Sequence, residues 1–501
     1  MNQSFAQSIG SYLYTHDVSE SLIDYIKERR WFRRKSEVIN KIAVRDYAVL
    51  NENPAEILLI LEIYYENFSS DIYYFPVIVD VKPSEEKNYE VILSLSINDS
   101  MCQLYDAFAD IKFCANLLKL IRQKKQIKSL KGVFSFSPMD ILKKIDSESC
   151  EERIKLLSVE QSNTSINYNN SLIMKNYRNI EYGLNPDFEI SYFLTKETDM
   201  KNIPSLLGYI EYQNQDKLTA TAAVLQEFIA NKGDCWSYTL IEIEQTLRTA
   251  MRNCCVSNDE EIKKIIKSFS KQFLDEMFRL GEITGSFHKA LTTNIDDEAF
   301  VAENISSDDI NAWHKVMVND IDSILGKIMQ NLSSYSEEIQ EQVSVVLDQK
   351  QVLLDLVSQL LDLKGSNQKK IRVHGDYHLG QVLKTVDDFV ILDFEGEPIK
   401  TLEERRAKFL PQKDIAGMLR SFNYATCTCL YELPGIDGDE LANLKIWAAI
   451  WEKLVKEAFL DGYVSIMRDE LPPDDIFKKS LMAYQIDKAV YELDYEINNR
   501  P

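Results

Sequence analysis

Two short segments, 373–383 and 390–398, limit the possible folds of this chain more than any other part of its sequence. The first contains Asp376 within Val-His-Gly-Asp-Tyr-His-Leu-Gly-Gln-Val-Leu, and the second contains Asp393 within Val-Ile-Leu-Asp-Phe-Glu-Gly-Glu-Pro. Both place carboxylates beside a β-prone apolar run that ends in a polar, glycine-containing turn. The sequence therefore predicts a hairpin-like unit that presents both aspartates to a cleft. Its expected strands are 371–373 and 389–392.

The residue types in these segments fit the chemistry of phosphoryl transfer. That reaction needs one carboxylate to orient the attacking hydroxyl, and a second carboxylate with a neutral oxygen ligand to hold Mg²⁺. Asp376 is the candidate for the first role, and Asp393 with Gln381 for the second. Glu395 is a further candidate ligand. A single aspartate after a strand often only caps a turn, but the linked set favours a functional interpretation.

The order of these residues resembles the kinase catalytic loop, in which an aspartate precedes an amide and then the Mg²⁺-binding aspartate of the next strand. The version His-Gly-Asp-x-His-x-Gly-Gln, followed by Leu-Asp-Phe-Glu-Gly-Glu-Pro, is similar to the maltokinase family, itself similar to aminoglycoside and choline phosphotransferases. Gln381 stands where most such kinases have asparagine. The resemblance extends from Arg-Trp-Phe at 30–32 to Tyr-Glu-Leu-Asp-Tyr-Glu at 491–496.

This resemblance implies an α+β, protein-kinase-like two-lobed fold with an N-terminal α/β cap subdomain and a mostly helical C-lobe. It implies ATP and Mg²⁺ as cofactors and maltose as acceptor, giving maltose 1-phosphate for α-glucan (glycogen) synthesis. Related chains are often fused to a trehalose synthase domain. Because we expect no such domain in this sequence, any such partner here would be a separate chain. Two alternatives remain open: a kinase for another sugar or amino sugar such as glucosamine, and an ATP-binding pseudokinase or scaffold.

The pattern of apolar residues divides the chain into three segments. An amphipathic helix and three strand-like runs come first, and after Trp236 the apolar residues recur at helical spacing. The predicted segments are a cap subdomain at 1–89, an intermediate subdomain with a nucleotide-binding N-lobe at 90–230, and a helical C-lobe with the catalytic loop and sugar site at 231–501.

Lys175 is the candidate nucleotide-binding lysine, because it ends the strand-like run Leu-Ile-Met-Lys. In kinase-like proteins a strand lysine contacts the nucleotide phosphates and pairs with a glutamate on the next helix. Asn185 marks the start of that helix, and Glu189 would fall in its first turn. The alternative interpretation is a lysine on an edge strand that faces solvent.

The remaining nucleotide contacts are expected around this strand. The glycines of a phosphate-covering loop are absent, so the hydroxyls of Ser162 and Thr164 would have to cover the phosphates together with backbone amides. A further strand near 218–224 leads to the segment where kinase lobes join and backbone groups meet adenine. The candidates there are Gln226, Glu227 and Ile229.

Aromatic faces and carboxylates suit a sugar, because C–H faces stack and hydroxyls need acceptors. The same acidic residues would equally hold an amine, and an aromatic core with surface acids is the alternative interpretation. We expect His288 and His374 to be structural. The candidate sugar contacts are His378, Asp414, Arg420, Tyr491, Glu492 and Tyr495.

The charge balance argues against nucleic acid as a partner. The formal net charge of −22 leaves no broad basic surface to neutralise phosphates.

The N-terminus resembles no secretory signal, and no uncharged apolar run approaches the length of a membrane span. The eight cysteines lack paired metal-binding spacing. We therefore expect a cytoplasmic protein without a membrane partner.

Overall fold

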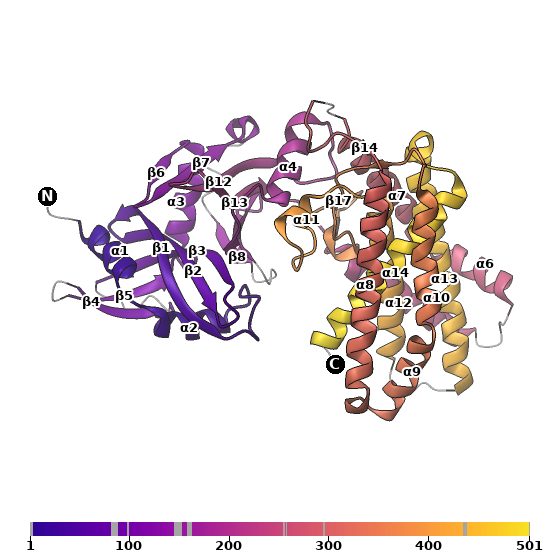
Figure 1. Ribbon diagram of the computed structural model, residues 1–501. Helices are drawn as coiled ribbons and strands as arrows, with labels where there is room; N and C mark the ends of the chain where they lie inside the picture. Colours follow the sequence, from indigo (N-terminus) through magenta and orange to yellow (C-terminus); the bar gives the residue numbers. More distant parts are fainter. Residues whose placement is uncertain are drawn as a thin grey trace. The chain divides into compact units, whose positions relative to one another are not determined.

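The computed structural model describes residues 4–81, 89–97, 100–144, 153–157, 163–253, 256, 258–293, 296–433 and 438–499. The chain forms two compact units (Figure 1). The first comprises Met1–Tyr192 with Pro204–Ala230, and the second comprises Phe193–Ile203 with Asn231–Pro501.

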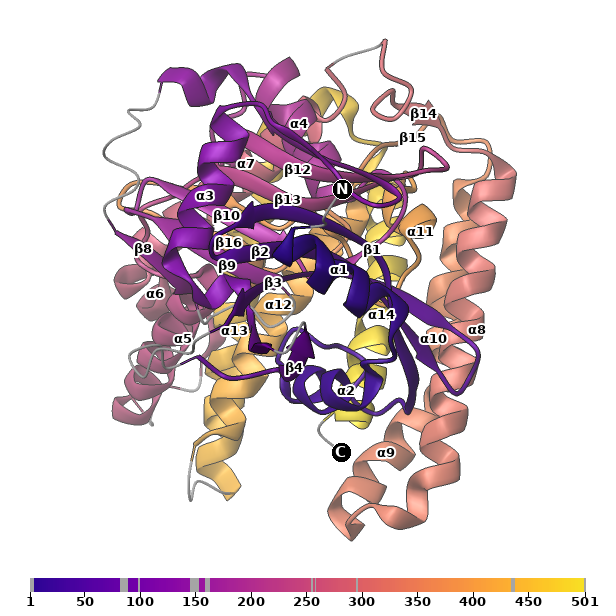
Figure 2. The same cartoon turned by 90° about the vertical axis from the view of Figure 1, so that its left-hand side faces the viewer.

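The first sheet of unit 1 is an antiparallel meander that follows two short helices. The helices are α1 (Phe5–Thr15) and α2 (Ser19–Glu28). The strands are β1 (Ile39–Glu52), β2 (Ala55–Tyr65), β3 (Ser70–Asp80), β5 (Ser100–Asp106) and β4 (Leu93–Ile97) in that spatial order, with β11 (Asn179–Ile180) paired to β3. The predicted boundary of the cap at residue 89 therefore falls inside a sheet, because β4 and β5 continue it. Helix α1 lies over β1 and β2 (Figure 2).

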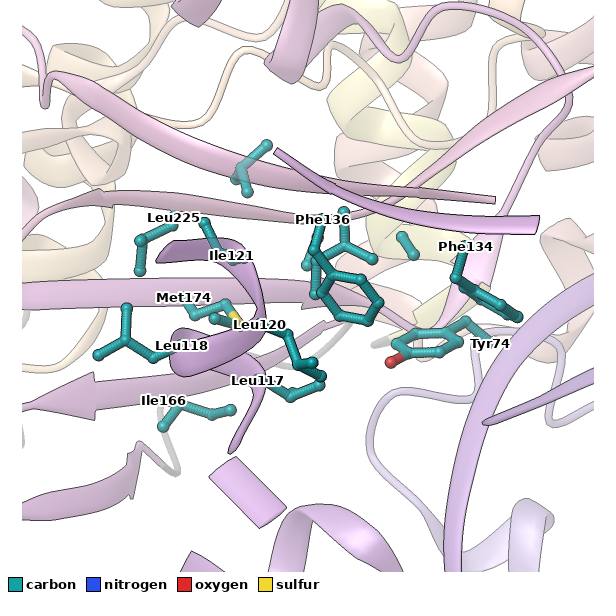
Figure 3. Packing of buried hydrophobic residues seen from close by; sticks show 14 of the residues in the cluster. Tyr74, Leu117, Leu118, Leu120, Ile121, Phe134, Phe136, Ile166, Met174 and Leu225 are labelled. Carbon is teal, nitrogen blue, oxygen red and sulfur yellow. The ribbon is translucent and has the colours of Figure 1, made fainter. Parts of the chain in front are cut away.

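The second sheet of unit 1 has seven strands. In spatial order they are β6 (Gln126–Lys128), β7 (Gly132–Pro138), β12 (Leu206–Asn214), β13 (Thr219–Glu227), β10 (Leu172–Tyr177), β9 (Asn163–Tyr168) and β8 (Ile154–Leu157). Helix α3 (Ile111–Arg122) packs its apolar stripe on this sheet (Figure 3). Strand β10 lies inside the sheet between β13 and β9, which places its side chains within the core and not at an edge.

One hydrophobic core joins α3, the second sheet and one face of the first sheet. Figure 3 shows Leu117 and Ile121 of α3 among Phe136 and Met174 of the sheet, with Tyr74 of β3 at the same cluster. The opposite face of the first sheet packs against α1, α2 and the buried Trp-Phe pair at 31–32. Strand β2 is therefore buried on both faces, which fits its run of five apolar residues at 57–61.

Unit 2 is mostly helical, as the spacing of apolar residues predicts. Its helices include α5 (Cys235–Arg252), α6 (Asp259–Phe269), α7 (Lys271–Ala290), α8 (Ser307–Asn331), α9 (Glu337–Asp348), α10 (Lys350–Ser358), α11 (Leu402–Arg406), α12 (Gln412–Tyr431), α13 (Gly438–Met467) and α14 (Asp474–Asn499). Helix α14 packs against α8, α10 and α12 (Figure 2). Helix α4 (Pro186–Glu197) begins in unit 1 and ends in unit 2.

Two glycines let α7 and α13 approach each other closely. A Cβ atom on Gly281 would lie 2.0 Å from the carbonyl oxygen of Phe459, and one on Gly462 would lie 1.9 Å from that of Phe278. Backbone atoms cannot move away as a flexible side chain can. The crossing therefore requires glycine on both helices.

In the part of the chain that the structure describes, no helix has the length and apolar character needed to cross a membrane.

Candidate functional site

The predicted hairpin forms, but with a different pair of strands. Strand β16 (Val382–Lys384) pairs antiparallel with β17 (Phe389–Ile391). The segment 371–373 is not part of a ladder: Ile371 makes an isolated bridge to Phe409, with hydrogen bonds of 2.9 Å in both directions. A segment as short as Ile-Arg-Val indicates burial but not what it pairs with, so this strand was predicted wrongly.

Asp376 lies in the loop before this hairpin and forms an ion pair with a residue from the end of the chain. Nζ of Lys488, on α14, lies 2.9 Å from Oδ1 of Asp376 and 3.3 Å from Oε1 of Glu397. Burial by itself would raise the pKa of Asp376, but the ammonium of Lys488, with smaller contributions from His378 and His374, outweighs it and holds that pKa well below its usual range. Asp376 is therefore ionised at neutral pH.

Asp414 braces the backbone of the loop at 374–381, which the sequence predicts to be the catalytic loop and which we refer to by that name. Its Oδ2 accepts a hydrogen bond of 2.7 Å from the backbone N–H of His374, and Oδ1 accepts one of 2.9 Å from Gly375. Nε2 of His288 lies 3.1 Å from the same Oδ2. Asp414 is only 1% exposed. Both oxygens are used by the protein itself, so Asp414 supports the loop and is not the sugar contact expected from the sequence.

Two histidines hold this brace in place, as expected of structural residues. Nδ1 of His288 lies 2.9 Å from the hydroxyl of Tyr463 on α13, which orients the imidazole toward Asp414. Nε2 of His374 lies 2.8 Å from the carbonyl oxygen of Leu392, which ties the loop to the end of β17. The catalytic loop is thereby fixed from α7, α12, α13 and the hairpin.

Gln381 and Asp393 are side by side at the hairpin. Nε2 of Gln381 donates a hydrogen bond of 3.0 Å to Oδ2 of Asp393. Asp393 has φ of 63°, the left-handed region that only a few residue types besides glycine tolerate and that occurs often at functional sites. The carboxylate of Asp393 and the amide oxygen of Gln381 are hard donors of the kind that Mg²⁺ takes. Glu395 is half-buried two residues later.

In unit 1, Lys175 is buried on the inner strand β10 and is 8% exposed. This burial contradicts the alternative of a solvent-facing edge lysine. Its Nζ lies 3.0 Å from Oδ2 of Asp187, which also accepts a hydrogen bond of 2.7 Å from the hydroxyl of Tyr177. Asn185 caps the start of α4, as predicted, and Glu189 is buried in the first turn. The sequence prediction missed Asp187, which lies in that same turn.

Of the two residues expected to cover phosphates, the structure places only Thr164. Ser162 lies outside the described residues. Thr164 pairs with residue 176 and so faces away from Lys175, and its Oγ1 accepts a hydrogen bond of 2.8 Å from Nε of Arg178. Ser165 pairs directly with Lys175 and shares its face, and its buried Oγ has no hydrogen-bond partner among the residues that the structure describes. Ser165 is therefore the better candidate for a phosphate contact.

The three hinge candidates lie at the end of β13. Gln226 and Glu227 belong to that strand and pair with β10. Nε2 of Gln226 donates to Oγ of Ser191 at 3.3 Å. Ile229 follows the strand and is half-buried. Because β13 ends at Glu227, the backbone after Glu227 is the part that is no longer committed to this strand.

The remaining sugar-contact candidates lie in unit 2. Arg420 donates to Oε2 of Glu492 at 2.7 and 3.1 Å. The ring of Tyr491 lies 4.5 Å from Nζ of Lys488. Tyr495 is 49% exposed. Nδ1 of His378 accepts a hydrogen bond of 3.1 Å from the N–H of residue 380, and His378 is part of the catalytic loop itself.

Comparison with known proteins supports the fold and points to particular relatives. No model of a known protein family matches the chain. A glucosamine kinase from Streptacidiphilus jiangxiensis is 25% identical over 228 residues, 44% of this chain and 45% of that protein, so the match spans less than half of this relative. A glucosamine kinase from Mycolicibacterium smegmatis is 20% identical over 353 residues, 69% of this chain and 75% of that protein.

Solved structures agree over nearly the whole chain. A glucosamine kinase in complex with glucosamine, ADP and inorganic phosphate has a TM-score of 0.64 at 15% identity, and the match covers 100% of this chain and 96% of that one. The chain therefore has the kinase-like α+β fold that the sequence predicts, with a sheet-containing N-terminal unit and a helical C-terminal unit. The particular proteins that it resembles in these comparisons are glucosamine kinases, where the sequence motifs had suggested maltokinases.

Proposed function

We propose that the protein is an ATP-dependent kinase that transfers the γ-phosphoryl group to a hydroxyl of a sugar. The observation that carries this proposal is the catalytic loop of unit 2. There the ionised Asp376 precedes the Gln381–Asp393 pair, on a loop that Asp414 and two histidines hold rigid. Rigid placement of a base and a metal-binding pair is what phosphoryl transfer requires.

Each unit has its own part of this chemistry. In unit 1, the ammonium of Lys175 and the buried hydroxyl of Ser165 are suited to nucleotide phosphates. In unit 2, Asp376 would accept the hydrogen bond of the attacking hydroxyl, and Gln381 and Asp393 would hold Mg²⁺. Bound Mg²⁺ neutralises charge on the phosphate oxygens. Glu395 is a further candidate ligand for the metal.

Glucosamine is the leading acceptor, because the two sequence relatives reported above and the solved structure matched over the whole chain are glucosamine kinases. Maltose, with maltose 1-phosphate as product, is the second candidate. The catalytic motifs favour it, and so does the pairing of two acidic residues: Glu397 shares Lys488, and Glu492 binds Arg420. Carboxylates that already have cationic partners attract an amine less strongly than unpaired ones.

The test is a Mg²⁺-dependent ATP-consumption assay with glucosamine, maltose, glucose, trehalose and an aminoglycoside. Consumption with glucosamine alone would establish the leading acceptor. Consumption with maltose, giving a product without reducing power, would establish the second candidate, and a trehalose synthase would then be the partner to test. Nucleotide binding without turnover on any acceptor would instead support a pseudokinase.

Replacing Lys175 by Met is expected to raise the KM for ATP by roughly 10- to 100-fold, because a hydrogen bond to a charged group contributes about 1.5–3 kcal/mol. Some loss of thermal stability should accompany it, since Asp187 loses its ammonium partner. Lys155→Met, on the exposed side of edge strand β8, is the matched control. An unchanged KM for ATP would remove Lys175 from the nucleotide site.

Asp393→Asn is expected to increase the Mg²⁺ concentration needed for half-maximal rate. Asparagine keeps the side-chain shape and tolerates the left-handed backbone at φ of 63°, but it loses the charge that a hard divalent cation prefers. The measurement is a Mg²⁺ titration of the initial rate. Asp387→Asn, in the exposed turn between β16 and β17, should titrate like the wild type. A wild-type curve for Asp393→Asn would contradict the metal assignment.

A further inference from the structure

Lys488 lies on the last helix of the chain, yet its ammonium is built into the catalytic loop. It contacts Oδ1 of Asp376 at 2.9 Å and Oε1 of Glu397 at 3.3 Å, and the ring of Tyr491 lies 4.5 Å from Nζ. The side chain is 15% exposed. A buried lysine of this kind is held by its anionic partners, because burial alone disfavours the charged form.

The ion pair uses only one oxygen of the catalytic carboxylate. Oδ1 of Asp376 accepts from Lys488. Among the described residues, Oδ2 of Asp376 accepts no hydrogen bond, and Nε2 of His378 lies 4.0 Å from it. When a hydrogen bond fixes one oxygen of a carboxylate, the orientation of the second oxygen is defined as well. Oδ2 is thus left for a hydroxyl of the acceptor.

We propose that Lys488 is a positioning residue for phosphoryl transfer: it fixes Oδ1 of Asp376 so that Oδ2 receives the hydroxyl of the sugar. This inference rests on the proposed function. In the reaction, the hydroxyl oxygen forms a bond to the γ-phosphorus while the bond from that phosphorus to the leaving oxygen of ADP breaks. The hydroxyl proton passes to Oδ2 of Asp376. A weakly basic carboxylate suits a loose transition state, in which the proton moves late.

The charges around Asp376 make this inference testable by pH. The groups that face it are Lys488 from α14 and His374 and His378 from its own loop. Glu397, Lys413 and Asp487 line the same small cavity. Lys488 is the principal group that lowers the pKa of Asp376, so its removal leaves burial to raise that pKa.

The experiment compares Lys488→Met and Lys488→Arg with wild type in the pH dependence of kcat/KM for the acceptor. We expect the acidic limb of the Met variant to move up by about 1–3 pH units, the usual effect of an opposite charge at this distance. Its kcat should fall while its KM for ATP stays unchanged. Arginine should restore the position of the limb. An acidic limb at the wild-type position in Lys488→Met would overturn the proposal.

Lys479→Met is the matched control. Lys479 lies on the same helix and pairs with Asp362 at 2.7 Å near the surface, so its loss should leave the pH profile unchanged. If this control moved the limb as much as Lys488→Met does, the shift would reflect the helix as a whole and the proposal would fail.

A second measurement separates this proposal from the proposed function. The pKa of the Asp376 carboxyl group is followed by ¹³C NMR of aspartate-labelled protein, with Asp376→Asn to assign the signal. The expected pKa is below the ordinary range in wild type and higher in Lys488→Met. Should wild type phosphorylate none of the sugars, the proposed function and the catalytic role of Lys488 would both fall, even if this pKa difference is observed. Equal carboxyl pKa values in both proteins would overturn the Lys488 proposal while leaving the kinase proposal intact.

Discussion

Asp376→Asn is expected to lower kcat by about 10²- to 10⁴-fold, the range for losing a positioned general base. The amide keeps the shape of the side chain but cannot take the hydroxyl proton. The fold should survive, because Lys488 keeps Glu397 as a partner. Turnover is measured at saturating ATP and sugar, and binding of each ligand by calorimetry.

Binding that persists alongside lost turnover would assign the defect to the chemical step. Asp387→Asn makes the same chemical change in an exposed turn and should retain full turnover. Near-normal turnover of Asp376→Asn would show that another group accepts the proton.

Asp414→Ala is expected to lower the free energy of unfolding by several kcal/mol, because each buried donor left without its acceptor costs about 1–3 kcal/mol. The backbone N–H groups of His374 and Gly375 would lose their acceptor inside the protein. Activity should fall as well, because these residues immediately precede Asp376. Denaturant titration followed by far-UV circular dichroism measures the loss, and Asp414→Asn, which keeps one acceptor oxygen, should be intermediate.

The effect of Asp414 should depend on pH with a definite sign. Burial raises the pKa of Asp414, but hydrogen bonds from His288 and the loop outweigh it, so its pKa in the folded protein is lowered. The stabilisation is therefore fully present above the ordinary carboxyl range and is lost as pH falls through the folded pKa. The stability difference between wild type and Asp414→Ala should narrow in acid. A constant difference from neutral pH down to acid unfolding would mean that the carboxylate charge contributes nothing.

Local signals in the sequence were sufficient for much of unit 1. The apolar alternation located β1, β2 and β3, and Asn185 marked the start of α4. Local signals did not show that Asp187 would contact Lys175. Residues two apart on a helix point about 200° away from each other, so the partner depends on which side of α4 faces β10, and this depends on packing.

The same limit applies to the catalytic loop and to the phosphate contact. Lys488 is separated from Asp376 by 112 residues, and no spacing rule connects them. The choice between Thr164 and Ser165 depends on a shift of one residue in strand register, which moves a side chain to the other face of the sheet. The sequence identified the chemical groups of the loop; their partners come from the tertiary structure.

The close crossing of α7 and α13 has a consequence for engineering this protein. Replacing helical glycines by alanine is a common route to heat resistance, since alanine stabilises a helix by up to about 1 kcal/mol relative to glycine. At Gly281 and Gly462 the new methyl group would instead meet a backbone carbonyl of the other helix. The separated helices would carry His288 and Tyr463 apart. A consensus or alanine-scanning library should therefore hold both positions fixed, because a change there would be recorded as lost catalysis although neither glycine belongs to the catalytic loop.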